Sequence, residues 1–375
     1  MSPVPPFKIN ASPRKDAERL MLPLQALKRS ARYALIRAGL EGSAIALRTG
    51  LPSKTPTRGV IFALHHVDPQ TPPGWTPNAW LSITPAFLEE AINAARAQGL
   101  TPIALEDLPE RLADESDTRR YVSFTLDDGY RDNARFAAPV FQRHGIPYTI
   151  FITSGFVERS RSIWWKTAQE ITMCCETVDL ARIGIDGRVS ASTRMAKIAL
   201  FDRLSDLVTD AQDEDAAIAL LDDLAQAHGV NPLEITERLT MSAEELADLA
   251  GDPLARFGAH TLTHANLRKV DDARLHQELS ASASKLRGYV GVSPTTFAYP
   301  YGYPSAVGAR EIAAVEQAGF AAAVTTQPGL LSPGARDALA ALPRVSLNGF
   351  YQRRRYVEAL LSGLPFRLRG NPAAQ

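Results

Sequence analysis

The sequence predicts an α/β fold, either a (β/α) barrel or a distorted version of one. Short apolar segments rich in strand-forming residues alternate with segments of helical spacing, which is typical of βαβ units around a mostly parallel sheet. The chain has 375 residues and an ordinary apolar content of 45%, and barrels of this size form one domain. Acidic and histidine side chains follow several predicted strands, where barrel enzymes keep their active sites.

The first half of the alternation starts near residue 58 and contains three predicted strands separated by two predicted helices. The first helix closes on Gly99, a residue that commonly ends helices. In chain order the five segments are GVIFALHHV (59–67), PAFLEEAINAARAQG (85–99), YVSFTLDDG (121–129), DNARFAAPVFQRHG (132–145) and PYTIFITSG (147–155).

Between residues 157 and 253 the pattern becomes mainly helical, and we interpret this stretch as an insertion in the barrel. Its last predicted helix opens with a capping box formed by Ser242 and Glu245. The alternation then resumes, with helices near 271–289 and 305–318. The strands predicted there are RFGAHT (256–261), TTFAYPYG (295–302), AAAVTT (321–326) and LPRVSL (342–347).

Three regions follow from this pattern: an N-terminal arm with an amphipathic helix (1–57), the barrel with its insertion (58–365) and a C-terminal tail (366–375). Within the first region, apolar residues recur at helical spacing over 24–38, and Gly39 is the predicted stop. The other face of this helix is basic. We expect it either to pack on its own domain or to make a peripheral membrane contact.

Composition excludes several classes of protein. Lysine plus arginine equals aspartate plus glutamate, 41 each, so no overall field attracts nucleic acid. The basic stretch 351–356 is interpreted as a solvated helix face. The two cysteines are neighbours, Cys174 and Cys175, and we expect them to be reduced. No apolar run spans a membrane and no signal-peptide core is seen, so we expect a cytoplasmic protein, either free or at the inner membrane face.

Two adjacent carboxylates, Asp127 and Asp128, end a predicted strand, and two histidines four residues apart, His260 and His264, follow another. In a helical turn that spacing would put both imidazoles on one face. Two imidazoles and one carboxylate are a typical protein ligand set for a hydrolytic zinc site, which keeps one position open. We predict that Asp128, His260 and His264 hold a divalent metal, with zinc first and cobalt, nickel or manganese also accepted.

Asp127 then has a separate role, because a general base must reach the attacking water. Each motif alone has a common structural interpretation, a turn for Asp-Asp-Gly and a surface pair for the histidines. The position of both motifs at predicted strand ends favours a metal site. A third motif, FAYPYG at 297–302, contains Pro300 and Gly302, which fix a turn that can aim backbone N–H groups at an oxyanion. An ordinary aromatic turn is the alternative.

The motifs TLDDG, HTLTH and FAYPYG, in this order, resemble those of the polysaccharide deacetylases of carbohydrate esterase family four, the nodulation-deacetylase homology group. The resemblance covers roughly 58–347, with the insertion poorly covered. It implies a distorted (β/α) barrel and metal-dependent removal of an acetyl group, usually N-acetyl from a hexosamine. The roles it implies for Asp127, Asp128, His260 and His264 agree with those above. It adds the backbone N–H of Tyr301 as an oxyanion donor.

The sequence departs from the family pattern in three places. Leu126 replaces the usual phenylalanine, which we interpret as a packing change. Ala298 stands where an arginine often orients the base. We expect Arg344 to supply that guanidinium from another strand through a bidentate contact to Asp127, with a surface salt bridge as the alternative. The late histidine that serves many members as general acid is absent, since no histidine follows His276.

The first predicted strand ends in two histidines, His65 and His66, and side chains alternate along a strand, so one of them should point into the mouth. Some relatives end this strand with Tyr-His-x-Val, and LHHV resembles that pattern with His65 in the histidine position. We therefore predict His65 as the general acid, on the side of the metal opposite Asp127. His66 is the alternative, and a buried hydrogen-bonded histidine is the structural interpretation of both.

The sequence thus predicts a zinc-dependent deacetylase acting on an N-acetylated saccharide. A metal-dependent amide hydrolase with a non-sugar substrate and a non-catalytic carbohydrate- or metal-binding relic are the two alternatives. Trp164 and Trp165, at the start of the insertion, are expected either to pack a corner of it or to stack on a sugar ring.

Overall fold

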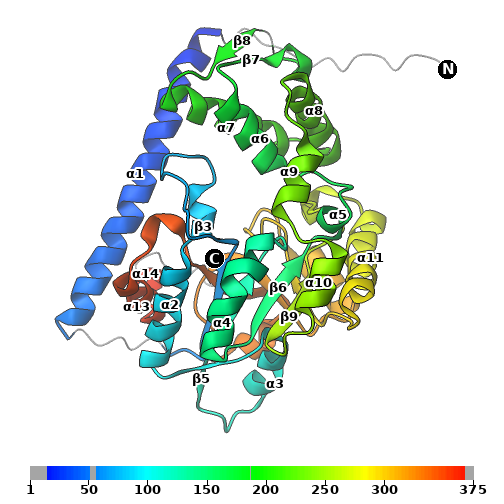
Figure 1. Cartoon of the computed structure of the whole chain (residues 1–375). Helices are drawn as coiled ribbons and strands as arrows, with labels where there is room; N and C mark the ends of the chain where they lie inside the picture. Colours follow the sequence, from blue (N-terminus) through cyan, green and yellow to red (C-terminus); the bar gives the residue numbers. More distant parts are fainter. Residues whose placement is uncertain (1–14, 51–55, 186, 368–375) are drawn as a thin grey trace.

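The computed structural model describes residues 15–50, 56–185 and 187–367, with residues 15–30 described by their backbone only (Figure 1). Residues 1–14 and 51–55 of the predicted N-terminal region, and residues 368–375 of the predicted tail, therefore lie outside the described residues. The barrel forms the lower half of the view in Figure 1, the helical insertion stands above it, and α1 runs along one side of both.

Seven parallel strands close into a ring, because β1 pairs with β5 on one side and with β12 on the other. The ring confirms the predicted distorted barrel. Around the ring its strands are β1 (Gly59–Leu64), β5 (Arg120–Leu126), β6 (Tyr148–Ile152), β9 (Ala255–Ala259), β10 (Thr296–Ala298), β11 (Ala322–Pro328) and β12 (Leu342–Ser346).

The ring is uneven. β10 is only three residues long and touches β9 through one register pair, Phe297 with Ala259, and the register between β11 and β12 shifts. A further strand, β4 (Leu100–Pro102), pairs with the first residues of β5, ahead of the part that pairs with β6. β1 is buried at every residue and β5 at all but the first. Apolar residues therefore dominate both strands, as expected in a parallel sheet covered by helices.

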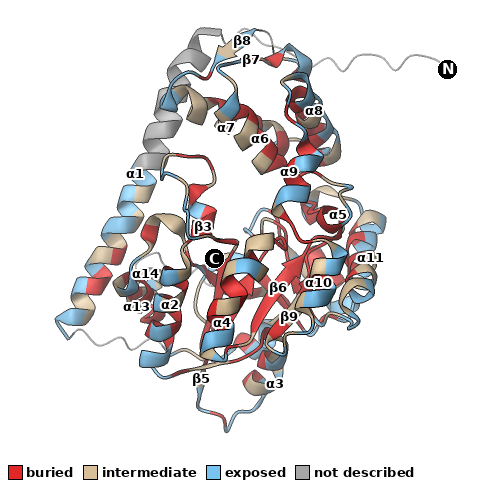
Figure 2. Ribbon diagram, viewed as in Figure 1, coloured by how far each residue is buried: buried red, intermediate tan, exposed pale blue. Residues whose placement is uncertain are grey.

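Helices cover the outside of the ring, as Figure 2 shows by the buried strands beneath exposed helix faces. The α-helices outside the insertion and α1 are α2 (Pro85–Ala97), α3 (Leu108–Ala113), α4 (Ala138–His144), α11 (Asp272–Val290), α12 (Ala309–Gln317), α13 (Arg354–Leu361) and α14 (Leu364–Arg367) in the described part of the chain. Short elements between them are β2 (His66–Val67), β3 (Ser82–Ile83), η1 (Ala79–Leu81), η2 (Leu105–Asp107), η3 (Asn133–Ala137), η5 (Leu267–Lys269), η6 (Ala335–Ala341) and η7 (Gly349–Tyr351).

The segment between β6 and β9 is mainly helical and has an apolar core of its own. The predicted capping box is present at the start of α10, since the Ser242 hydroxyl accepts the N–H of Glu245 and the Glu245 carboxylate accepts the N–H of Ser242. A two-stranded hairpin in this segment was not predicted. The elements are α5 (Ser154–Val157), α6 (Trp164–Cys174), β7 (Thr177–Asp179), η4 (Leu180–Ile183), β8 (Arg188–Ser190), α7 (Arg194–Thr209), α8 (Glu214–Ala227), α9 (Pro232–Leu239) and α10 (Ala243–Leu249).

The N-terminal helix α1 spans Lys15–Arg48, so the predicted stop at Gly39 is wrong. The helix continues because Leu40, Ser43 and Ala44 are buried against the barrel side, and tertiary packing outweighs the low helix propensity of glycine. Despite its length, neither α1 nor any other helix in the described part of the chain is long and apolar enough to cross a membrane.

Candidate active site

The two carboxylates leave β5 in different directions. Asp127 continues the strand, and its N–H donates to the carbonyl of Leu64 at 3.0 Å. Asp128 adopts a left-handed backbone conformation with φ 74°, followed by Gly129 with φ 68°. A side chain on Gly129 would also meet Ile152 at 2.9 Å. This turn needs glycine, and it lets two neighbouring anions serve separate partners.

The two histidines follow β9 on an irregular loop, so the predicted helical turn is wrong. Positive φ values at Thr261 (64°) and His264 (57°) fold the loop back and bring the imidazoles together. The loop is anchored by buried Glu278 on α11, whose carboxylate accepts the N–H groups of Leu262 at 2.7 Å and Thr263 at 3.0 Å. Single residues in the left-handed region carry strain that the surroundings must hold.

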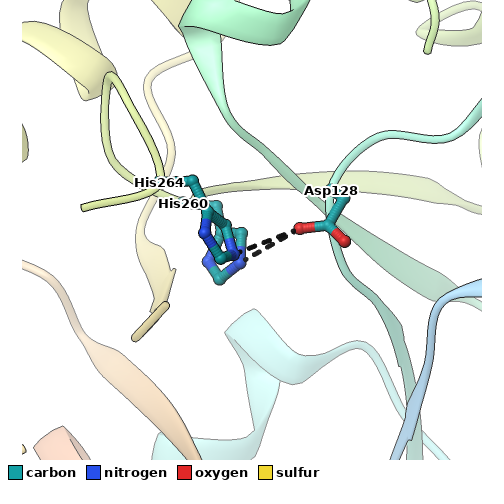
Figure 3. A group of neighbouring side chains, drawn as sticks. All are labelled: Asp128, His260 and His264. Atoms are coloured by element: carbon teal, nitrogen blue, oxygen red, sulfur yellow. Dashed lines mark ion pairs between the residues drawn. The ribbon is translucent and has the colours of Figure 1, made fainter. Parts of the chain in front are cut away.

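Asp128, His260 and His264 converge in a buried cluster (Figure 3). Oδ1 of Asp128 lies 3.5 Å from the Nε2 atom of each histidine, and the three ligand atoms lie within 4.8 Å of one another. His260 donates its Nδ1–H to the carbonyl of Ala298 at 2.7 Å, which leaves Nε2 with a free lone pair. Oδ1 of Asp128 is buried and has no hydrogen-bond partner within the described residues, so the set fits a divalent cation.

The electrostatics of the cluster also suit metal binding. Burial tends to raise the pKa of Asp128, but the two histidines outweigh burial and lower that pKa well below its usual range. Burial lowers the pKa of His264 to about 3. For His260, burial also opposes the charged form, yet the Asp128 and Asp127 carboxylates together raise its pKa. Asp128 and His264 therefore favour the ionised carboxylate and the neutral imidazole that a metal needs, whereas the raised pKa of His260 makes a proton compete with a cation at that ring.

Asp127 forms a buried ion pair with Arg344, whose side chain is 1% exposed. Nη1 of Arg344 donates to Oδ1 at 2.7 Å, and Nη2 donates to Oδ2 at 2.8 Å. The guanidinium is held in turn by the carbonyl of Thr325 at 2.8 Å and the hydroxyl of Thr125 at 3.1 Å. Burial favours the neutral acid, but Arg344 outweighs it and lowers the pKa of Asp127. Asp127 is therefore ionised and free of the metal cluster.

Of the two histidines after β1, His65 faces the site. Its Nε2 atom lies 3.9 Å from Oδ2 of Asp127, and its side chain is 21% exposed. His65 thus stands beside Asp127, whereas the sequence had suggested the opposite side of the metal. Burial lowers its pKa, although the Asp127 and Asp128 carboxylates act the other way. His66 turns away: its Nδ1–H donates to Asp132 at 2.6 Å and its ring stacks on Tyr130 at 3.7 Å.

Tyr301 sits on the predicted FAYPYG turn with φ 62°, beside Gly302 with φ 61°. Its N–H makes no hydrogen bond to any described residue, and its carbonyl accepts the hydroxyl of Thr326 at 2.7 Å. Its phenol donates to Glu214 of α8 and accepts the indole N–H of Trp164 at 3.0 Å. The turn is thereby tied to the insertion, and its backbone N–H is left for a ligand.

The insertion also packs directly on the metal cluster. Trp165 lies against the ring of His264, with centroids 4.7 Å apart, and its indole N–H donates to the Tyr130 hydroxyl at 3.2 Å. Trp164 and Trp165 are both buried, so they pack the insertion against the site. Of the two roles expected from the sequence, packing and stacking on a sugar ring, the structure shows packing. The sulfur atoms of Cys174 and Cys175, further along α6, are 3.3 Å apart and form no disulfide.

Sequence reasoning missed four residues that shape the site. Asp132 fixes His66, Glu278 fixes the histidine loop, and Glu214 fixes Tyr301. Trp80 of η1 lies beside His65, with ring centroids 6.1 Å apart, and is 37% exposed. Asp132 lies five residues after Asp127, just beyond the TLDDG motif, so its carboxylate could have been considered from the sequence. The other three come from distant segments that only the fold brings to the mouth.

A closed parallel barrel with an ionised Asp–Arg pair beside an Asp–His–His cluster at its strand ends defines a hydrolase. The chain belongs to the polysaccharide deacetylase family, whose model matches residues 114–185 and 210–323. The match includes both aspartates, both cluster histidines and Tyr301. His65 and Arg344 lie outside it, so their assignment rests on the geometry above.

Two solved structures illustrate the shared fold. The putative polysaccharide deacetylase BA0330 from Bacillus anthracis has 17% identity and a TM-score of 0.50, over 82% of this chain and 68% of that chain. IcaB from Ammonifex degensii has 17% identity and a TM-score of 0.50, over 81% of this chain and 98% of that chain. At this identity the likeness shows the fold alone. The sequence has no match among curated proteins.

Proposed function

We propose that the protein is a metal-dependent hydrolase that removes the acetyl group from an N-acetylated saccharide. The observation that carries the proposal is the pairing of two units at one barrel mouth, the Asp128–His260–His264 cluster and the ionised Asp127 held by Arg344. Membership of the polysaccharide deacetylase family supports an acetylated sugar as substrate. The exposed indole of Trp80 beside His65 adds an aromatic surface suited to a sugar ring.

Asp128, His260 and His264 are the residues that would hold the cation, and zinc is our first choice because the set joins imidazole nitrogen with carboxylate oxygen. When bound, the cation supplies Lewis-acid chemistry, polarising the acetyl carbonyl and making water more acidic. The chain supplies the rest. Asp128 follows the end of β5, and the histidine loop is held by hydrogen bonds to Glu278. These supports position the three ligand atoms independently of a bound cation.

In the proposed reaction Asp127 takes a proton from the attacking water, and a C–O bond forms at the acetyl carbon. Arg344 keeps Asp127 ionised and correctly oriented for that step. The backbone N–H of Tyr301 donates to the oxygen that becomes negative. His65 then protonates the sugar nitrogen as the C–N bond breaks, which releases a free amine and acetate.

The close approach of His65 and Asp127, 3.9 Å between Nε2 and Oδ2, is compatible with both roles. The proton taken by Asp127 has only this short distance to travel to restore His65 for the next cycle. Burial outweighs the two carboxylates and lowers the pKa of His65, so the imidazole favours its neutral form until it receives the proton that Asp127 has taken from water. The two groups therefore act as a base and an acid that share one side of the site.

Acetate release from N-acetylated chitooligosaccharides tests the proposal. The full chain is stripped with a chelator, dialysed against zinc, and compared with the stripped protein. We expect acetate only from the metal-loaded protein. Cleavage of simple acetylated amines without cleavage of the saccharides would favour a non-sugar amide hydrolase. Metal binding without turnover of any acetylated amide or ester would favour a non-catalytic relic.

A further inference from the structure

The outer face of α1 is apolar and uncovered. Successive helical residues turn by about 100°, so the residues opposite the buried Leu40 and Ala44 form one continuous stripe. Leu35 is 74% exposed and Ile45 is 60% exposed. The stripe, which we call the outer stripe, carries no charged side chain and consists of Ala31, Ala34, Leu35, Ala38, Gly42 and Ile45, all exposed among the described residues.

Arginines border the outer stripe. Arg32, Arg37 and Arg48 are exposed on α1, and exposed Arg353 lies just before the neighbouring α13. Glu41, the single acid between residues 31 and 48, accepts hydrogen bonds from Arg355 and Tyr356, with Arg355 Nη2 at 2.6 Å. These partners lower the pKa of Glu41 to about 2. The border is therefore net positive, and its one carboxylate is neutralised by its own partners.

An apolar cavity of about 460 Å³ lies beside the same helix, between α1 and the β12–α13 side of the barrel. Leu35 belongs both to the outer stripe and to the wall of this cavity, so the two apolar surfaces are continuous. Opposite α1 the wall is formed by Leu347, Leu360 and Phe366. An alkyl chain of a ligand in contact with the outer stripe could therefore extend into this cavity.

Two partners fit an exposed apolar helix face, a second copy of the chain or a lipid surface. In a symmetric dimer the same face meets itself, and here that would bring the arginine borders of two copies together with no free acid among residues 31–48 of α1 to pair them. A lipid surface with negative headgroups pairs with those arginines, while the stripe enters the acyl region. Charge complementarity therefore favours the lipid surface.

We propose that the outer stripe of α1 and its arginine border form a peripheral docking surface for an anionic phospholipid bilayer. The helix would lie in the plane of the interface, since no described helix can span a membrane. This inference does not depend on the deacetylase reaction. It goes beyond the basic 24–38 helix considered from the sequence, because the contact face is the apolar side of residues 31–45 with arginines at its edges.

Co-sedimentation with lipid vesicles tests the docking surface. The full chain is mixed with vesicles of phosphatidylcholine or of an equal mixture of phosphatidylcholine and phosphatidylglycerol. We expect binding to the mixed vesicles only, weakened by salt. The double variant Leu35→Glu, Ile45→Glu should bind about tenfold or more weakly, because two side chains that would enter the lipid become charged. Arg32→Gln with Arg37→Gln should also weaken binding.

The matched control is Val292→Glu, which places the same charge at a residue that is 71% exposed on the turn after α11. It should bind as wild type does, and unchanged thermal melting should show that all variants fold. Failure of the wild type to bind mixed vesicles, or equal binding by the Leu35→Glu, Ile45→Glu variant, would overturn the proposal. A wild-type dimer that this variant converts to monomer would also overturn it in favour of a second copy.

Discussion

Arg344 on β12 donates hydrogen bonds to both carboxylate oxygens of Asp127, at 2.7 and 2.8 Å, across the single strand β1 that separates β12 from β5. The two residues are 217 positions apart in the sequence, on β12 and at the end of β5, and both are buried. Ala298 on β10 carries no guanidinium, and the one that pairs with Asp127 comes from β12, as the sequence predicted. The pair keeps one carboxylate ionised next to a second, Asp128, which belongs to the Asp128–His260–His264 cluster.

Replacing Arg344 with Met should leave Asp127 as a buried charge without a partner. We expect the free energy of unfolding to fall by about 3–5 kcal/mol, the usual result of breaking a buried ion pair. Urea denaturation at pH 7 measures it. Arg336→Met is the control, because Arg336 pairs with Glu115 on the surface, and its loss should cost less than about 1 kcal/mol. An equal loss of unfolding free energy in the two variants would contradict the expectation that the buried Arg344–Asp127 pair matters more for stability than a surface pair.

Replacing His264 with Ala should remove the metal, because the two remaining ligands do not hold zinc tightly. Elemental analysis of the zinc-dialysed protein measures the content. His228→Ala is a suitable control, since His228 lies at the end of α8 and is not in the cluster. We expect close to one metal ion in the wild type and the control, and little in the variant. The same metal content in all three would rule out the assigned ligands.

Replacing Asp127 with Asn keeps the shape of the side chain but removes the proton acceptor. Acetate release should fall by about 10²–10⁴-fold, the range typical of a general base, while metal content stays at the wild-type level. Both quantities are measured on the same preparation. Loss of metal in Asp127→Asn would mean that Asp127 is the metal ligand and Asp128 the base. Full activity would mean that Asp127 is not the general base.

Replacing His65 with Ala should abolish cleavage of the amide but spare an acetyl ester with a good leaving group, because such a group departs without an acid. Metal content should not change. His66→Ala should instead lower stability, since it breaks the buried contact with Asp132, and should leave the ratio of amide to ester cleavage near wild type. Wild-type amide cleavage in both variants would place the acid elsewhere.

Asp222 in α8 provides a pH-dependent test of the insertion. Burial raises its pKa from 3.8 to about 6, although Ser162 donates to its Oδ2 at 2.7 Å and acts the other way. A raised pKa in the folded state favours folding in acid, and that contribution is lost as the pH rises from about 4 through 6. A pKa raised from 3.8 to about 6 corresponds to about 3 kcal/mol at most, so Asp222→Asn should raise stability by up to that amount at pH 7.5 and give no gain at pH 4.

Thermal melting at both pH values measures the Asp222 effect, with the exposed neighbour Asp223→Asn as control. The control should show little change at either pH. A gain for Asp222→Asn that is equal at pH 4 and pH 7.5 would mean that ionisation of this carboxylate is not the cause.

The sequence by itself determined the barrel class and much of the site. Strand and helix periods differ in the sequence itself, so the alternation is local information. Asp127, Asp128, His260 and His264 were predicted as site residues because active sites in this fold lie at strand ends, and strand ends are visible in the local sequence; the structure brings the four side chains to one mouth of the barrel. The capping box at Ser242 was found for the same reason, since its partner is three residues away.

The tertiary structure decided what depends on distant segments and on backbone conformation. It showed that His65 faces Asp127 while His66 pairs with Asp132, because the chain breaks the strand between Leu64 and His66. It replaced the predicted helical turn at His260 with a loop whose left-handed residues are held by Glu278 on α11. It showed that α1 continues beyond Gly39, because packing against α13 outweighs the tendency of glycine to end a helix. Each outcome depends on contacts between residues far apart in the chain, and local sequence patterns do not encode such contacts.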